Sequence, residues 1–100
     1  MPQGAGAVKR IKVAMTRWNG ERITLRIGRR FNVYDFKRRY VVDSRWINAG
    51  EDIRNRQTLY ESSSFEATAA RLNGMVKSLI ISGFDIKRAT RGFYETAEDD

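Results

Sequence analysis

Apolar and polar residues alternate along residues 10–28, which is the pattern of two half-buried strands joined by a turn. A two-residue turn at Asn19–Gly20 would pair apolar positions with polar ones, although cross-strand partners must share a face. A three-residue turn, with Gly20 in the left-handed conformation, removes this conflict and gives the hairpin one apolar face. The turn is then Trp18–Gly20, and the predicted pairs are Arg17 with Glu21, Met15 with Ile23, Val13 with Leu25 and Ile11 with Ile27.

The opposite face of this hairpin is polar and cationic. Lys12 and Arg26 fall directly opposite each other, and like charges in that arrangement destabilise a sheet by up to about 1 kcal/mol. Such a face suits the binding of an anion, and it is equally compatible with a solvated surface whose long side chains splay apart. The face comprises Arg10, Lys12, Ala14, Thr16, Arg22, Thr24 and Arg26.

Two segments after the hairpin extend the predicted sheet. Residues 31–36 alternate in polarity and continue the second strand beyond a bend or bulge at Gly28. The basic cluster at 37–39 is expected at a turn, either as a phosphate clamp or as a solvated loop. The third strand covers 40–48, and because neither of its faces is uniformly polar, its orientation stays open.

The fourth predicted strand covers residues 53–60 and follows a turn at 49–52, where Gly50 is a candidate for the left-handed conformation. One face of this strand carries guanidinium groups, a hydroxyl group and an aromatic ring. That combination resembles the outer face of the first hairpin, so the two sets are expected to form one surface. The set is Arg54, Arg56, Thr58 and Tyr60.

The spacing of apolar residues changes to a helical period after residue 63. Ser63 and Glu66 have the spacing of a capping box, which predicts an amphipathic helix over 64–82. Gly74 interrupts the apolar stripe at a cost of about 1 kcal/mol relative to alanine, and a close approach of the helix to the sheet would explain it. The stripe consists of Phe65, Ala69, Leu72, Met75, Val76, Leu79 and Ile80.

The segment after the helix is short and becomes acidic. Gly83 is expected to end the helix in the left-handed conformation, with Phe84 folded back onto the last turn. Residues 84–88 alternate in polarity and form a candidate short fifth strand. Residues 89–100 are expected to form an acidic C-terminal tail.

These elements predict an α+β fold, in which a four-stranded antiparallel sheet of order β-β-β-β-α carries one C-terminal amphipathic helix on one face. The helix should cover the apolar side of the hairpin and leave the basic side open. A single domain is expected over 8–88, after a flexible N-terminal arm at 1–7. Because a lone four-stranded sheet has exposed edges, we expect a homodimer.

The charge of the chain indicates what kind of partner the protein binds. The formal net charge is +7, and arginines outnumber lysines by 14 to 5. Arginine forks match phosphate geometry and stack on bases, so this bias favours nucleic acid as the partner. The positive charge belongs to the strands, because residues 1–60 hold 14 basic and 5 acidic residues, whereas residues 61–100 hold 5 and 7.

Cysteine and histidine are both missing from the chain. Their absence excludes disulfides, thiol catalysis and the usual zinc sites, and we expect no cofactor or metal. No apolar stretch has the length of a signal-peptide core or of a membrane span. We therefore expect a soluble, intracellular protein of the cytoplasm or nucleoid.

The pattern and the charge together favour a non-enzymatic protein that binds single-stranded DNA or RNA with little sequence specificity. Cations on the open face would follow the phosphate backbone, and aromatic rings among them would stack on bases. Trp18, at the hairpin tip, is interpreted either as a stacking residue or as a cap on the core edge. The predicted nucleic-acid-binding residues are Arg10, Lys12, Trp18, Arg22, Arg26, Arg30, Arg38, Arg39, Arg54, Arg56 and Tyr60.

Two other functions stay open at this point. A protein-interaction module, such as a regulator of a nucleic-acid-processing enzyme, could present the same basic face to an acidic partner. Catalysis is not expected, because without histidine or cysteine the acid–base work would fall to carboxylates or tyrosine. A magnesium-dependent nuclease would have to use the acids near the basic strands, which are Asp43, Glu51, Asp52 and Glu61.

Overall fold

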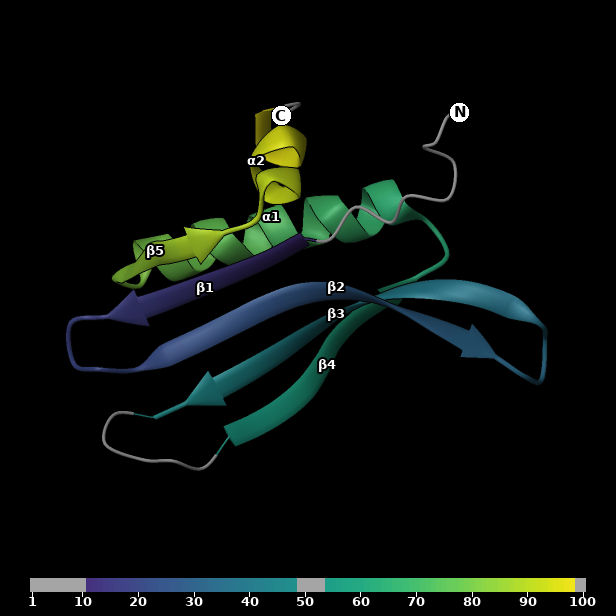
Figure 1. Cartoon of the computed structure of the whole chain (residues 1–100), viewed down its shortest axis with the longest axis horizontal. Coiled ribbons are helices and arrows are strands. Elements are labelled where there is room, and N and C mark those ends of the chain that lie inside the picture. The colour runs from purple at the N-terminus through teal and green to yellow at the C-terminus, as the bar shows by residue number, and fades with distance from the viewer. Residues whose placement is uncertain (1–10, 49–53, 99–100) are drawn as a thin grey trace.

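Five strands form one antiparallel sheet in the order β4-β3-β2-β1-β5, and the helix α1 packs across one face of it (Figure 1). This computed structural model describes residues 11–48 and 54–98, so the predicted arm at 1–7, the turn at 49–52 and Arg10 lie outside the described residues. The α+β class predicted from the sequence is confirmed. The elements are β1 (Ile11–Arg17), β2 (Arg22–Asn32), β3 (Lys37–Ile47), β4 (Arg54–Ser62), α1 (Phe65–Ile81), β5 (Phe84–Ala89) and α2 (Arg91–Glu98).

The hairpin of β1 and β2 has the predicted register. The Arg17 amide donates a hydrogen bond to the Glu21 carbonyl oxygen at 2.9 Å, which closes a three-residue turn. Gly20 has a φ of 96°, the left-handed conformation that the turn requires. The apolar pairs are Ile11 with Ile27, Val13 with Leu25 and Met15 with Ile23, as predicted.

The strands β2 and β3 extend past their neighbours as a two-stranded ribbon, residues 29–39 (Figure 1). The pairing runs through Gly28 without a register shift, so the predicted bulge at this residue is wrong. The turn lies at 33–36, where we expected strand. The basic cluster at 37–39, expected at a turn, instead begins β3.

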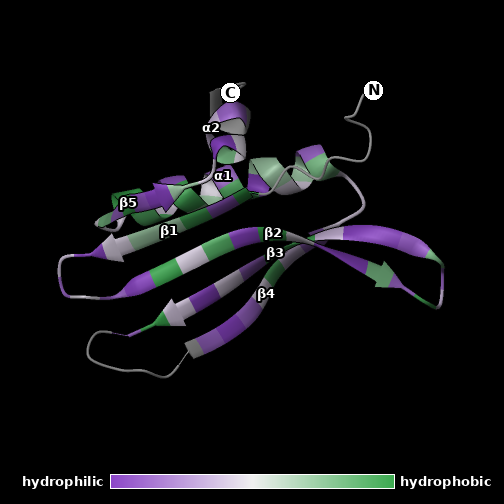
Figure 2. Ribbon diagram, in the orientation of Figure 1, coloured by the Kyte–Doolittle hydropathy of each residue, from purple (hydrophilic) through white to green (hydrophobic). Residues whose placement is uncertain are grey.

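A β-bulge in β4 changes which way its last residues point. The register with β3 passes from Asp43↔Thr58 to Val42↔Tyr60, so Leu59 is an extra residue in β4. Tyr60 therefore shares a face with the buried Val42 and not with Arg56, which corrects its predicted place on the basic face. Figure 2 shows that the rest of β4 is hydrophilic along most of its length.

The helix α1 covers the apolar face with the predicted stripe, except that Ile80 is 47% exposed and does not pack against the core. Its N-cap is Ser64, one residue later than expected, and the Ser64 hydroxyl accepts a hydrogen bond from the Ala67 amide at 3.1 Å. Leu72 and Val76 are buried against the strands. At Gly74, no atom lies within 4 Å of the position that a Cβ would occupy. The expected close approach of helix to sheet at this residue is therefore wrong.

The C-terminal part adds a strand and a second helix. Gly83, with a φ of 103°, ends α1 as predicted, and its amide donates to the Ile80 carbonyl oxygen at 3.0 Å. The candidate fifth strand is confirmed as β5, which pairs with β1. The segment expected to be an acidic tail forms α2, because Phe93 is buried in the core. Neither helix of the described residues has the length and apolar character needed to span a membrane.

Candidate functional site

The face of the sheet opposite α1, here called the open face, carries a row that contains two opposed arginines. Arg56 of β4 pairs with Arg45 of β3, and Arg45 pairs with Thr24 of β2. At the other end of the row, Arg88 of β5 pairs with Ala14 of β1. Directly opposed like charges destabilise a sheet, so this arrangement works against folding stability.

The next row of the open face contains a single acid among its cations. Lys12 pairs with Arg26, as predicted, and Arg26 pairs with Asp43. The Arg26 guanidinium lies 3.9 Å from the Asp43 carboxylate, and both side chains are partly exposed. An exposed ion pair of this kind stabilises a protein by about 0–1 kcal/mol at most, so it leaves Arg26 able to turn to an outside anion.

A hollow of about 300 Å³ lies between these two rows, here called the central hollow. Four of its lining side chains are cations and one is a carboxylate, so its electrostatic potential is positive. Guanidinium groups bind phosphate oxygens through paired hydrogen bonds, and the hydroxyl and amide groups here are further hydrogen-bonding partners. The lining residues are Lys12, Thr24, Arg26, Asp43, Ser44, Arg45, Arg56, Gln57 and Thr58.

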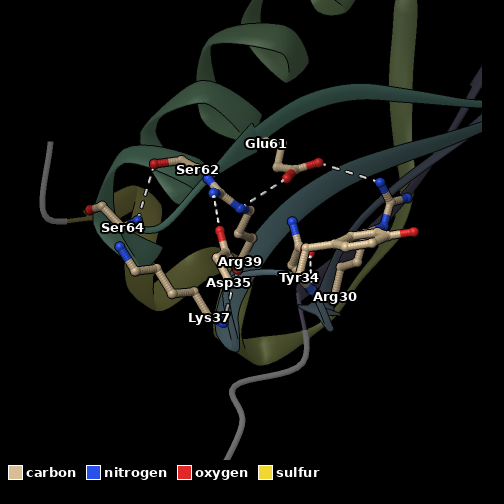
Figure 3. Close-up of polar contacts among 9 residues, drawn as sticks. Arg30, Tyr34, Asp35, Lys37, Arg39, Glu61, Ser62 and Ser64 are labelled. Carbon is tan, nitrogen blue, oxygen red and sulfur yellow. Dashed lines mark hydrogen bonds and ion pairs between the residues drawn. The ribbon is translucent and has the colours of Figure 1, made fainter.

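A chain of ion pairs continues from the open face along the ribbon (Figure 3). Arg30 lies 3.3 Å from one oxygen of Glu61, and Arg39 lies 3.4 Å from the other. Arg39 also reaches Asp35 of the turn at 3.0 Å, so it lies between two carboxylates. These pairs hold the ribbon against β4 and neutralise part of its charge.

The carboxyl group of Asp35 has a pKa below its ordinary value of 3.8. Partial desolvation raises this pKa, but hydrogen bonds from the Arg39 guanidinium and the Lys37 backbone amide outweigh that effect and favour the carboxylate. Asp35 is therefore charged at neutral pH and pairs with Arg39 there.

Most of the predicted binding residues do gather on the open face. Their positions follow from the register. The backbone of Arg54 pairs with Ile47, and its side chain lies outside the described part of the structure. The charges are thus on the side that α1 leaves uncovered, as predicted. The predicted residues on this face are Lys12, Arg22, Arg26, Arg30, Arg39 and Arg56.

Three predicted residues lie elsewhere. Arg38 pairs with Phe31 and shares the face of Tyr40, on the side of α1, which corrects its expected place. Tyr60 also lies on that side, with the Arg71 guanidinium 5.4 Å from the centre of its ring. Trp18 is 90% exposed at the β1–β2 turn, so it does not cap the core edge.

The predicted mixture of cations and rings on the sheet surface is wrong. Within residues 11–48 and 54–98, no aromatic side chain lies on the open face. The most exposed rings lie at the two turns that flank it, with Trp18 at one turn and Tyr34 and Phe36 at the other. The open face therefore presents cations and hydrogen-bonding groups, and the exposed rings lie at the turns that flank it.

Sequence reasoning missed Arg45 and Arg88. The orientation of β3 could not be read from the sequence, because Val41 and Val42 face opposite sides and are both apolar and buried, so they did not tell which way Arg45 points. Arg88 had no local signal either, since its face depends on the bulged pairing of β5 with β1. That pairing joins the two ends of the chain and cannot be read from a local pattern.

A second hollow, of about 550 Å³, lies between α1 and the sheet and is mostly apolar. Gly74 borders it, so the lack of a side chain there helps to keep the space open. Leu59, the extra residue of the bulge, lies at its margin and is 37% exposed. The other lining residues are Ile23, Leu25, Trp46, Ala70, Arg71, Met75, Ser78 and Leu79.

No protein-family model matches the chain, and no curated protein or solved structure is significantly similar to it. The register places Asp43, Glu61 and Asp85 on the open face, and Asp43 and Glu61 each lie beside an arginine. The described part of the chain has no group of three or more acidic, histidine or cysteine side chains that could hold a metal ion. The geometry thus offers a surface of hydrogen-bond donors and positive charge.

Proposed function

We propose that this chain binds nucleic acid without catalysis, preferring single strands and reading little of their sequence, through the open face of its sheet. The observation that carries the proposal is the pair of like-charged contacts, Lys12 with Arg26 and Arg45 with Arg56, around the central hollow. A phosphate bound between such groups would add a negative charge beside both members of each pair and so lower their mutual repulsion.

The extent of the charged surface supports a polymer over a single small anion. Arg22 and Arg30 lie on the same face of β2, eight residues apart, which is a distance of about 26 Å along a strand. The central hollow lies between them. One phosphate occupies only part of that length, whereas a strand with repeated phosphates contacts several cations in succession.

The exposed rings at the turns support a preference for single strands. Bases of a single strand are available for stacking on aromatic side chains, at about 1–3 kcal/mol per base, whereas those of a duplex are stacked on each other. Trp18 and Tyr34 are almost fully exposed at opposite ends of the open face. This function would place the protein in the cytoplasm or nucleoid.

The outer strands β4 and β5 leave sheet edges at which a second copy could pair to form a homodimer.

Fluorescence anisotropy with labelled single- and double-stranded DNA and RNA tests the proposal. Lys12→Glu reverses a charge at the central hollow, and Lys77→Glu makes the same change on α1, which covers the other face. We expect Lys12→Glu to weaken single-strand binding about tenfold or more and Lys77→Glu to change it much less. Undetectable binding by the unaltered chain, or equal weakening by both variants, would contradict the proposal.

The competing function is a protein-interaction module that regulates a nucleic-acid-processing enzyme. The observation that favours it is the second hollow, which lies beside the edge strand β4 and is lined by Trp46 and Leu59. An incoming strand could pair with β4 and place an apolar side chain there. This function predicts a stable complex with a protein partner and little oligonucleotide binding in the same assay.

A further inference from the structure

The turn between β2 and β3 exposes a cluster of apolar side chains. Tyr34 is 93% exposed, Phe36 is 77% exposed, and Phe31 and Val33 beside them are more than half exposed. The Phe31 and Phe36 rings meet edge to face, with centroids 6.2 Å apart, and Phe36 does not belong to the core. Large apolar groups gathered on a protein surface mark a place of contact with another molecule.

Phe36 adopts a backbone conformation that does not suit it. Its φ is 55°, which makes it the one non-glycine residue with a positive φ in the described chain. Glycine or asparagine takes this conformation with less steric penalty, and strained residues cluster at functional sites. The turn itself is fixed by other groups, because Asn32 accepts from the Tyr34 amide and Asp35 from the Lys37 amide. The Phe36 ring is therefore not needed to form the turn.

The turn is held in place relative to the open face. Arg39 joins Asp35 of the turn to Glu61 of β4, and Arg30 joins Glu61 to the Thr58 hydroxyl at 3.4 Å (Figure 3). Thr58 lines the central hollow. The Phe36 ring contacts Phe31, which lies on the α1 side of the ribbon, so a strand bound to the open face would have to pass over the turn to reach this ring.

The charges around the rings identify the occupant. Five cations lie on the ribbon beside the turn, and Glu61 and Asp35 pair with only two of them, Arg30 and Arg39. The remaining positive charge favours a group that belongs to a polyanion and is itself flat and apolar on its faces. Nucleobases have this chemistry, and unpaired bases alone expose their faces for stacking. The cations are Arg29, Arg30, Lys37, Arg38 and Arg39.

We infer that the β2–β3 turn, residues 33–36, stacks on unpaired bases of a strand whose phosphates lie on the open face, with Phe36 and Tyr34 as the stacking residues. The inference rests on the proposed function and adds the base contact that the open face itself does not offer. It assigns the discrimination between single strands and duplexes to this turn.

The test compares two oligonucleotides of equal length and charge, one of thymidine and one of abasic nucleotides. We expect the unaltered chain to bind the thymidine strand at least about fivefold more tightly. Phe36→Gly removes one of the two rings and relieves the strain, so it should reduce this preference, keep its affinity for the abasic strand and melt at the same or a higher temperature. Ile81→Ala, which trims an 86% exposed apolar side chain on α1, should keep the preference.

Other results overturn the inference in distinguishable ways. Equal binding of the two strands by the unaltered chain would refute stacking at the turn and leave the proposed function standing. If Phe36→Gly weakened binding of the thymidine strand and the abasic strand equally, the ring would affect binding through the folded structure and not by stacking on bases. Binding to vesicles of phosphatidylserine and phosphatidylcholine that depends on Phe36, without a base preference, would assign the turn to a membrane surface. No binding to either strand would refute the proposed function itself.

Discussion

The two faces of the sheet are made by the same strands and have opposite properties. Along β2, Leu25 is fully buried beneath α1, whereas its neighbours Thr24 and Arg26 line the central hollow on the open face. One face gains stability by burying apolar area, and the other places like charges opposite each other at some loss of stability. The comparison teaches that alternate residues of one strand can serve folding and binding separately, so substitutions on the two faces should have separable effects.

Leu25→Ala and Thr24→Ala should differ most. Leu25 is completely buried, and removing its side chain leaves a cavity, so we expect a loss of about 2–5 kcal/mol in the free energy of unfolding. Thr24 lies on the open face and should change stability by about 0.5 kcal/mol or less. Urea unfolding of the two variants measures this contrast. Similar losses for both would break the comparison.

The β1–β2 hairpin could be predicted from sequence down to individual pairs, because two constraints agreed there. The alternation of residues 11–27 fixed the faces, and a glycine at position 20 allowed the three-residue turn. In β4 the same reasoning placed Tyr60 on the wrong face, since the extra residue Leu59 shifts the alternation by one. Nothing in the sequence of β4 marks this bulge.

Arg56→Glu should lower binding without lowering stability. It replaces a like-charged contact with Arg45 by an attractive one, so we expect the free energy of unfolding to be unchanged or to rise by about 0.2–1 kcal/mol. Removing a cation from the central hollow should weaken single-strand binding about tenfold. Urea unfolding and anisotropy on the same variant check both. A clearly less stable variant that binds as before would refute the assignment.

Gly74→Ala tests the helix side of the comparison. The added methyl group meets nothing within 4 Å, so the gain in helix propensity should raise the free energy of unfolding by about 0.5–1 kcal/mol. Oligonucleotide affinity should stay the same, because α1 lies on the other face of the sheet. Thermal unfolding and anisotropy measure the two effects, and a loss of binding would show that the faces are coupled.

The candidate site was less predictable than the fold, for reasons that particular residues make clear. Local alternation placed Lys12 and Arg26 on one face. It could not show that Arg30 and Arg39 form ion pairs with Glu61, because Glu61 comes from another strand. Those two arginines are therefore engaged within the chain. The helix α2 was missed for a similar reason, since it has only eight residues and docks through Phe93, a contact with other elements that a local pattern does not reveal.

The smallest expected effect is the pH dependence of the Asp35 contact. The pKa of Asp35 is lowered from 3.8 in the folded chain, so the unfolded state takes up the proton first as the pH falls. The stabilisation is therefore complete above pH 3.8 and is lost as the pH falls through the lower, folded value. Asp35→Asn should be slightly less stable than the unaltered chain at neutral pH, and the difference should vanish in acid. A difference in the unfolding free energy that persists in acid would contradict the ion-pair account.

The salt dependence of single-strand binding tests the central claim most directly. If the four cations of the central hollow contact phosphates, the logarithm of the association constant should fall linearly with the logarithm of salt concentration, with a slope of about −3. Arg26→Glu should make that slope shallower by about one phosphate contact. Binding whose strength does not change with salt, or a slope that Arg26→Glu leaves intact, would contradict the claim that the open face binds the phosphate backbone.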